Sequence, residues 1–165
     1  MKPKAIPADI REIVGRVRED LKRPLAGHAI VVDVPRDAPL LQIDPVLIGQ
    51  ALSNLLENAA KYSPAGTKIT IRLEQRSGQA VLSVADQGPG VPEAERDRIF
   101  DILHRAERGD GAPSGTGLGL AIVNGMVEAH GGSVRVTTGP NGRGARFEMS
   151  LPIAESASRD AESAA

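Results

Sequence analysis

Residues 44–62 read DPVLIGQALSNLLENAAKY, and this stretch predicts a long amphipathic helix. Asp44 is a favoured N-cap, and Pro45 suits the first helical position because its φ is already helical and its missing N–H costs nothing there. Residues 63–66 (SPAG) then end the helix. Apolar side chains recur at helical spacing and form the face expected to be buried: Leu47, Ile48, Ala51, Leu52, Leu55, Leu56 and Ala59.

A polar stripe flanks this apolar face. Asn54, Asn58, Lys61 and Tyr62 follow one another at i, i+4, i+7 and i+8, so they lie along one line of the helix. Amide oxygens can ligate Mg²⁺, an ammonium group can neutralise phosphate charge, and a phenol ring can pack against a base. The stripe fits a phosphorylated, metal-bearing ligand; the alternative is a helix whose polar residues simply face water.

Helices and strands alternate along the rest of the sequence. Residues 68–75 alternate apolar and polar side chains, which is typical of a half-buried strand, and Ser77-Gly78 turns the chain into a second strand. Hairpins require antiparallel pairs, so we expect a mixed sheet of about five strands covered on one face by about three helices, a two-layer α/β sandwich. Strands are expected at 28–34, 40–43, 68–75, 80–85, 134–138 and 145–151, and helices at 9–23, 44–62, 93–100 and 117–129.

Two glycine-containing segments stand at the ends of these elements. Residues 86–90 (DQGPG) follow a strand, where the carboxylate can accept a hydrogen bond from an exocyclic amine such as that of adenine; an ordinary Asp-x-Gly turn is the alternative. Residues 115–120 (GTGLGL) lead into a helix, whose N-terminal N–H groups suit a phosphate, although they match neither a Walker A loop nor a Rossmann fingerprint. The polar residues 107–114 are expected to form a mobile lid over a phosphate chain.

Composition narrows the function classes. The 165 residues, 41% of them hydrophobic, suffice for one core built from Val, Ile, Leu and Ala. The net charge of -1 gives no reason to expect a nucleic-acid partner, and the absence of cysteine excludes disulfides, thiolate metal sites and cysteine nucleophiles. No apolar run approaches the ~20 residues of a membrane span. We therefore expect membrane contact only through missing parts of a parent protein.

The order and spacing of these segments resemble the N, G1 and G2 boxes of the histidine-kinase catalytic domain, within the ATPase superfamily shared with gyrase, Hsp90 and MutL. Residues 99–105 (IFDILHR) stand where that family has its F box, and residues 142–147 (GRGARF) resemble its last glycine box. The amino-acid sequence of residues 44–67 and 127–132 is most similar to that of the potassium-responsive Kdp-type sensor kinases. The fold implied is the Bergerat-type ATP-binding fold.

The resemblance implies ATP and Mg²⁺ as cofactors. Asn58 would ligate Mg²⁺, Asn54 would help to hold the metal and the phosphates, and Asp86 would bind the adenine amine. The other residues of the implied site are Lys61 and Arg105 on the phosphates, Tyr62 against the nucleotide, Gly88 and Gly90 beneath the base, Gly115, Thr116, Gly117, Leu118 and Gly119 around the phosphates, and Phe100 at the base of the lid. Of these, Asn54, Lys61 and Arg105 would take part in catalysis.

One position separates the branches of this superfamily. The gyrase and Hsp90 branch has a water-activating glutamate four residues before the metal-binding asparagine. This sequence has Asn54 there, and an amide cannot act as a general base. Glu57 belongs to a different helical face and does not replace it. The resemblance therefore implies phosphoryl transfer to a protein, resting on positioning and on charge neutralisation by Mg²⁺, Lys61 and Arg105, instead of rapid hydrolysis.

The acceptor of that phosphoryl group is not expected in this sequence. His28, His104 and His130 are each followed by a residue other than Glu or Asp, unlike the histidine of a phosphoacceptor box, and we expect His28 and His130 to be structural. The implied partner is a histidine-bearing helical domain of the same kinase, with a response regulator as the indirect partner. The segment before the first helix looks truncated, as if an upstream domain had been removed.

We expect one ATP-binding domain over residues 1–153 and a disordered tail over 154–165. The domain is expected to be monomeric and cytoplasmic, in a parent at the inner membrane. Two other functions stay open. One is a stand-alone serine kinase of the anti-sigma-factor type, which shares the boxes. The other is a regulatory module in which ATP only switches the lid, suggested by Leu103 and His104, which replace a second aromatic residue and a tyrosine usual in the F box.

Overall fold

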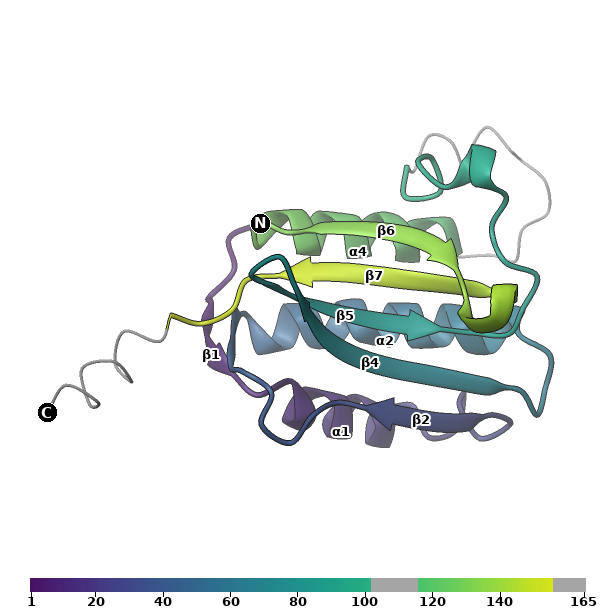
Figure 1. The fold of residues 1–165 in the computed structure, drawn as a ribbon, viewed down its shortest axis with the longest axis horizontal. Coiled ribbons are helices and arrows are strands. Elements are labelled where there is room, and N and C mark those ends of the chain that lie inside the picture. The colour runs from purple at the N-terminus through teal and green to yellow at the C-terminus, as the bar shows by residue number, and fades with distance from the viewer. Residues whose placement is uncertain (102–115, 156–165) are drawn as a thin grey trace, which may run out of the picture.

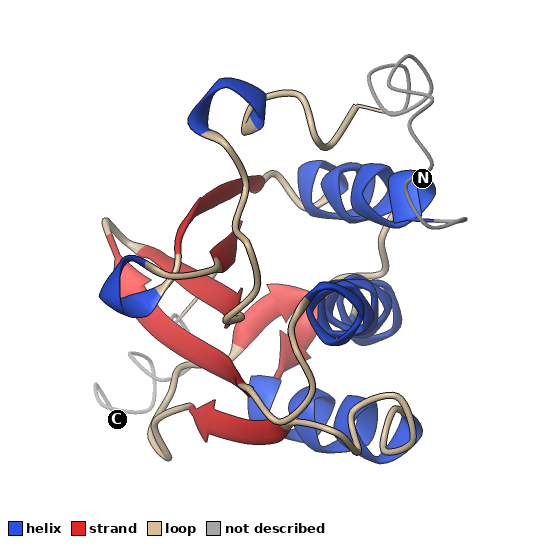
Figure 2. Cartoon of the chain, turned by 90° about the vertical axis from the view of Figure 1, so that its right-hand side faces the viewer, coloured by secondary structure: helices blue, strands red, loops and turns tan. Residues whose placement is uncertain are grey.

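Two layers make up the fold, a mixed sheet and the helices that cover one of its faces (Figures 1 and 2). The computed structural model describes residues 1–101 and 116–155 of the chain. The elements of the two layers are α1 (Ile10–Asp20), β2 (Ala29–Asp33), α2 (Pro45–Tyr62), β4 (Lys68–Arg76), β5 (Gln79–Ala85), α4 (Thr116–Ala129), β6 (Ser133–Thr138) and β7 (Ala145–Leu151). The strands lie in the order β2-β4-β5-β7-β6. The pair β2–β4 is parallel and the other pairs are antiparallel, which confirms the predicted mixed sheet.

Strand β4 shows why the sheet has one covered and one open face. Ile69, Ile71 and Leu73 are at most 4% exposed and lie in the core under the helices. Their neighbours Lys68 and Arg72 are exposed and belong to the opposite face. Successive side chains of a strand point to opposite faces, so the predicted alternation is confirmed. Branched aliphatic residues supply most of the core, as the composition required.

Helix α2 crosses the middle of the covered face. The carboxylate of Asp44 accepts hydrogen bonds from the backbone N–H groups of Val46 and Leu47 at 3.0 and 3.1 Å, which confirms the predicted N-cap. The predicted apolar face is buried except for Leu47, which is half-buried. This helix is the longest that the structure describes, yet across residues 1–101 and 116–155 no helix is long and apolar enough to cross a membrane.

A second, smaller sheet was only half predicted. The expected strand at 40–43 forms as β3 (Leu41–Ile43), but it pairs with β1 (Ile6–Ala8) and does not join the main sheet. Strand β1 has three residues, one of them Pro7, so it carries too little alternation to be predicted from sequence. The main chain of β3 is also held by the end of the chain, where the N–H of Gln42 donates to the carbonyl of Pro152 at 2.9 Å.

The helix predicted over residues 93–100 is longer than the helical segment that forms. The structure has a single 3₁₀ turn, η1 (Glu93–Glu95), followed by further turns up to Phe100. Its hydrogen bonds include i to i+3 pairs, such as the N–H of Arg96 to the carbonyl of Glu93 at 3.3 Å. A short segment with few apolar residues buries too little surface to stabilise an α-helix, which explains the difference.

Both described histidines have structural roles, as predicted. The Nε2 atom of His130 lies 3.0 Å from the backbone nitrogen of Asp44, and its Nδ1 lies 2.7 Å from the carbonyl oxygen of Met126. With these partners Nε2 accepts and Nδ1 donates. His130 thereby ties the end of α4 to the start of α2. His28 similarly bridges the carbonyl oxygens of Thr67 and Ala60 at 3.1 and 3.3 Å.

A buried carboxylate on the open face makes stability depend on pH. The side chain of Glu148 is only 4% exposed. Its carboxylate oxygens form ion pairs with the guanidinium groups of Arg76 at 3.0 Å and Arg135 at 2.7 Å. Burial alone would raise the pKa of Glu148, but the hydrogen bonds and charges of the two guanidinium groups outweigh burial and lower its pKa. The folded state therefore binds this proton less tightly than the unfolded state, so the stabilisation is present at neutral pH and is lost as pH falls.

We expect E148Q to be less stable than wild type by about 1–2 kcal/mol at pH 7, because it loses charged hydrogen bonds. The difference should shrink as pH falls below the ordinary glutamate pKa of 4.5, where the wild-type carboxylate becomes protonated. Urea unfolding at pH 7, 5, 4 and 3 measures both effects. A constant difference across that range would contradict this account. Some acid sensitivity should persist in E148Q, because the pKa values of Asp44 and Glu74 are lowered too.

Candidate functional site

The polar stripe of α2 lies as the helical spacing predicted. Asn54, Asn58 and Tyr62 are half-buried, whereas Lys61 is exposed. The completely buried residues of the same helix, such as Leu55 and Leu56, fix its rotation about its own axis. Glu57 is exposed, which agrees with its expected place on another face. The stripe therefore carries amides, an ammonium group and a phenol, without a carboxylate.

Asn54 joins α2 to the beginning of α4. Its Oδ1 accepts a hydrogen bond from Nε2 of Gln50 at 3.0 Å, and its Nδ2 donates to the carbonyl oxygen of Gly119 at 3.5 Å. The amide of Asn58, one turn later, makes no hydrogen bond with any residue in the described ranges. Its oxygen is thus available to a ligand, while Asn54 holds the two helices together. Sequence reasoning did not identify Gln50.

Asp86 comes directly after β5 and is 4% exposed. Its Oδ1 accepts hydrogen bonds from the backbone N–H groups of Gly88 at 2.9 Å and Ala145 at 3.1 Å. The N–H of Asp86 donates in turn to the carbonyl of Ala145 at 2.9 Å. These contacts orient the carboxylate and leave Oδ2 to accept a hydrogen bond from a ligand. Sequence reasoning missed Ala145, because its contribution is a backbone amide that any residue has.

Close backbone contacts bring these segments together. A Cβ atom on Gly88 would lie 2.8 Å from the carbonyl oxygen of Tyr62, so the loop after β5 meets the end of α2 with no room for a side chain. Gly90 has φ +78, and a Cβ there would lie 3.0 Å from the carbonyl oxygen of Gly144. The end of α2, the loop after β5 and the start of β7 therefore converge at one edge of the fold.

Gly144 offers a test of this packing, because its Cβ position coincides with the backbone and carboxylate of Asp86. We expect G144A to destabilise the fold by more than 2 kcal/mol, about the upper cost of a left-handed φ alone. Gly142 is the matched control: its φ of +72 is close to the +76 of Gly144, but nothing lies within 4 Å of its Cβ position. Urea unfolding compares the two variants. Equal losses in G142A and G144A would show that φ alone matters.

The glycine-rich segment is described only in part. Helix α4 begins at Thr116, one residue before the predicted start, so Gly117 and Gly119 lie in its first turn. First-turn N–H groups of a helix have no partner within the helix, and they suit an anion. The site residues Arg105 and Gly115 lie outside the described residues, as do Leu103 and His104. The side chains of Thr116 and Leu118 are likewise not described.

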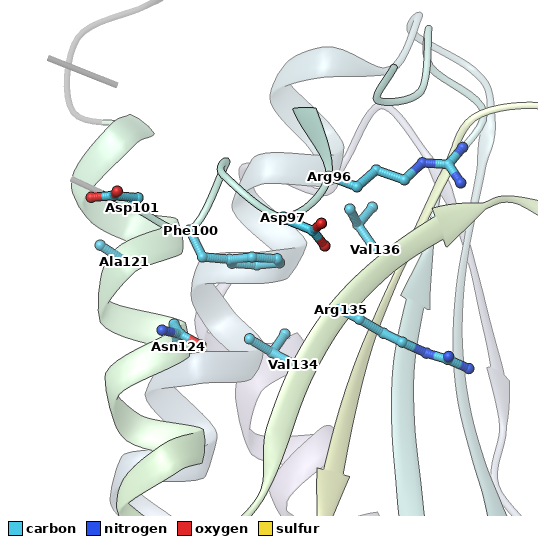
Figure 3. A pocket seen from close by; sticks show the side chains of 9 residues that line it. All are labelled: Arg96, Asp97, Phe100, Asp101, Ala121, Asn124, Val134, Arg135 and Val136. Carbon is cyan, nitrogen blue, oxygen red and sulfur yellow. The ribbon is translucent and has the colours of Figure 1, made fainter. Parts of the chain in front are cut away.

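Phe100 packs against a second aromatic ring of the core. Its ring packs edge-to-face on Phe147, with centroids 6.0 Å apart, and is 9% exposed. Figure 3 shows it between α4 and β6, facing a hollow of about 500 Å³ that Asn124 and Val134 also line. No residue of the α2 stripe lines this hollow. Phe100 thus fixes the end of the 93–101 segment on the apolar layer.

The residues present fit a Mg-nucleotide better than a metal held by protein alone. Among the described residues, no three His, Cys, Asp or Glu side chains gather as metal ligands. Mg²⁺ bound with a nucleotide needs only one or two protein ligands, since phosphates and waters supply the others. The amide of Asn58 can provide such an oxygen ligand. At the end of the same helix, the backbone of Gly88 packs directly against the backbone of Tyr62.

Comparisons with known proteins agree with this geometry. Residues 43–155 match the model of histidine kinase-, DNA gyrase B-, and HSP90-like ATPases. The chain is 39% identical over 143 residues to the adaptive-response sensory kinase SasA of Nostoc sp. strain PCC 7120, covering 86% of this chain and 35% of that protein. A second SasA, from Rippkaea orientalis, is 36% identical over 149 residues, covering 90% of this chain and 37% of that protein. The chain thus spans about a third of the length of these curated relatives.

Solved structures show the same likeness. The mycobacterial sensor histidine kinase MprB has a TM-score of 0.76 and 36% identity, covering 90% of this chain and 97% of that one. Full-length ShkA in complex with AMPPNP has a TM-score of 0.78 and 32% identity, covering 93% of this chain and 32% of that one. The curated relatives are SasA kinases, so the predicted similarity to Kdp-type kinases is not supported. The chain belongs to the family of histidine kinase-, DNA gyrase B-, and HSP90-like ATPases.

Proposed function

We propose that this chain binds Mg-ATP and donates the γ-phosphoryl group to a histidine on a separate helical domain of a two-component sensor kinase. The observation that carries the proposal is the stripe on α2. It places amides where the hydrolysing branch of the family has a catalytic glutamate, and Glu57 is exposed on another face. Without a general base for water, the site is suited to transfer between bound groups.

Each part of the nucleotide has a proposed partner. Oδ2 of Asp86 accepts a hydrogen bond from the adenine amine, while Oδ1 stays with its two backbone donors. Tyr62 lies against the nucleotide, with Gly88 and Gly90 beneath the base. The first turn of α4 supplies backbone donors to the phosphates. The proposed phosphate-binding residues are Gly115, Thr116, Gly117, Leu118 and Gly119.

Transfer then rests on position and charge. Mg²⁺, held by Asn58, would neutralise negative charge on the phosphates. Asn54 holds the start of α4 against α2, so it positions the phosphate-binding turn. Lys61 and Arg105 add positive charge as the bond from the γ-phosphorus to the bridging oxygen breaks and a bond to the imidazole nitrogen forms. ADP leaves, and the histidine carries the phosphoryl group for a response regulator.

The relatives support a sensor-kinase role and leave the stimulus open. SasA and MprB are named as sensory or sensor histidine kinases, and ShkA was solved with an ATP analogue. We propose that residues 1–153 form the ATP-binding unit, monomeric in isolation, with 154–165 as a tail. A cytoplasmic position follows from the need for ATP. No comparison supports potassium sensing or a parent at the inner membrane.

A phosphoryl-transfer assay tests the proposal. This domain is mixed with labelled ATP and with the helical domain of the parent protein, which is supplied in trans. Acid-labile label on a histidine of the helical domain is the expected result. Saturable ATP binding without transfer would favour the regulatory module, and phosphoserine on a partner would favour the serine kinase. Either outcome would overturn the histidine-kinase assignment for this chain.

A further inference from the structure

The face of the sheet without helices carries a groove that the proposed function does not use. Strand pairing places Val31, Thr70, Ala85 and Arg146 side by side across four strands. A hollow of about 420 Å³ lies over this row, and Lys68 also lines it. Ala85 has only a methyl group between longer neighbours, which explains why the surface is hollow there.

The groove has an excess of positive charge. Of the cationic side chains that line it, Arg72 already forms ion pairs with Asp33 at 3.6 Å and with Glu74 at 3.4 Å. Lys68 and Arg146 form no ion pair with any residue in the described parts of the chain. Among the described residues, Asp33 is the one acidic residue that lines the groove, and it is engaged with Arg72. Two positive charges are therefore available to a ligand.

Glu148, a close acidic neighbour on β7, does not cancel them. It lies beside Ser83 in the strand register, and both its oxygens are engaged by Arg76 and Arg135. Its lowered pKa, which those two guanidinium groups cause despite burial, keeps it ionised within this network at neutral pH. The ion pairs of Glu148 with Arg76 and Arg135 therefore do not neutralise the positive charges of Lys68 and Arg146 on the same face.

Two hydroxyl groups line the groove. The side chain of Ser83 makes no hydrogen bond within residues 1–101 and 116–155, so its hydroxyl can bond to a ligand. Thr70 lines the same groove and supplies a second hydroxyl beside it.

We propose that this groove binds a small phosphomonoester. The phosphate lies between Lys68 and Arg146, whose Cα atoms are about 12 Å apart by sheet geometry, a span that two long side chains can close from both ends. The hydroxyl of Ser83 donates to the phosphate from below. A bare phosphate ion would leave most of the groove unfilled, since hollows of this size hold larger ligands. Val31, which is 39% exposed, offers an apolar wall for the rest of the molecule.

This site is distinct from the nucleotide site. Lys68, Thr70 and Arg72 alternate along β4 with Ile69, Ile71 and Leu73, which face the helix-covered core. The groove therefore opens on the opposite side of the sheet from α2 and α4. Its occupation does not depend on the proposed kinase activity, and its failure would leave that proposal untouched.

The test follows backbone amide signals by NMR during titration with inorganic phosphate and, separately, phenyl phosphate. We expect saturable shifts at Thr70, Ser83, Ala85 and Arg146, with phenyl phosphate binding more tightly because its ring contacts Val31. The double variant K68A/R146A should weaken binding about tenfold or more, since hydrogen bonds to charged groups are lost. The double variant R16A/R18A removes the same two charges from exposed positions of α1 and should bind as wild type.

Several outcomes overturn the proposal. Shifts confined to α2 and α4 would place the anion in the nucleotide site alone. Equal weakening in R16A/R18A and in K68A/R146A would show a general charge effect without a site. Equal affinities for the two probes would overturn the apolar wall. S83A provides an independent check: its removal of one hydroxyl should weaken binding without changing the net charge.

Discussion

D86N is expected to weaken ATP binding about 10- to 100-fold, because a hydrogen bond to a charged group is worth about 1.5–3 kcal/mol. The asparagine oxygen can take the place of Oδ1, which accepts from the N–H groups of Gly88 and Ala145. The amide nitrogen then stands in place of Oδ2 and presents donors to the adenine amine, itself a donor. The variant therefore removes base recognition while keeping the contacts that shape the loop.

Calorimetric titration with Mg-ATP and Mg-GTP measures this effect. Wild type should prefer ATP, and D86N should lose most of that preference. D37N is the matched control, since Asp37 is exposed on the connection after β2 and should bind ATP as wild type. Thermal unfolding of D86N close to that of wild type would show that the fold persists. Unchanged ATP affinity in a folded D86N would refute the role of Asp86.

The sequence was most informative where the local signal was strong. Helix α2 has an N-cap, a proline at its first position and a full apolar stripe, and each of these acts within a few residues. Strand β4 likewise alternates from Lys68 to Glu74. Because the stripe on α2 is set by the same spacing, the relative places of Asn54, Asn58 and Tyr62 could be predicted together with the helix.

The partners of Asp86 could not be predicted, for two physical reasons. The bond from the N–H of Ala145 joins residues 59 positions apart, and its donor is a backbone group present at almost every residue. Only the register of β5 against β7 brings the two together. The residue motif around Asp86 marked the position, but the geometry that orients its carboxylate comes from tertiary structure.

Segments of weak periodicity account for the remaining differences. Residues 93–100 bear few apolar side chains, so a helix and a series of turns differ little in local preference, and contacts such as that of Phe100 with Phe147 decide the outcome. Strand β1 exists only through its pairing with β3. The open-face groove also escaped prediction, because Lys68, Ser83 and Arg146 meet through the order of the strands and belong to no common motif.

N58A should slow phosphoryl transfer to the helical domain by about 10- to 100-fold or more, the range seen even when groups that merely support a metal ligand are changed. Asn58 is half-buried, and its amide makes no hydrogen bond with another described residue, so truncation removes a ligand without breaking a structural contact. The buried residues around it, including Leu55 and Leu56, keep α2 in place. The loss should therefore appear in metal-dependent chemistry and hardly in stability.

The rate of histidine labelling, measured at rising Mg²⁺ concentration, separates the causes. If Asn58 holds the metal, N58A should need more Mg²⁺ and recover part of its rate at high concentration. N124A is the matched control, because Asn124 lies on α4 facing the hollow beside Phe100 and bonds to Glu128 at 3.3 Å (Figure 3). A rate loss in N58A that no Mg²⁺ concentration relieves would assign Asn58 to nucleotide positioning, and a wild-type rate would remove it from the site.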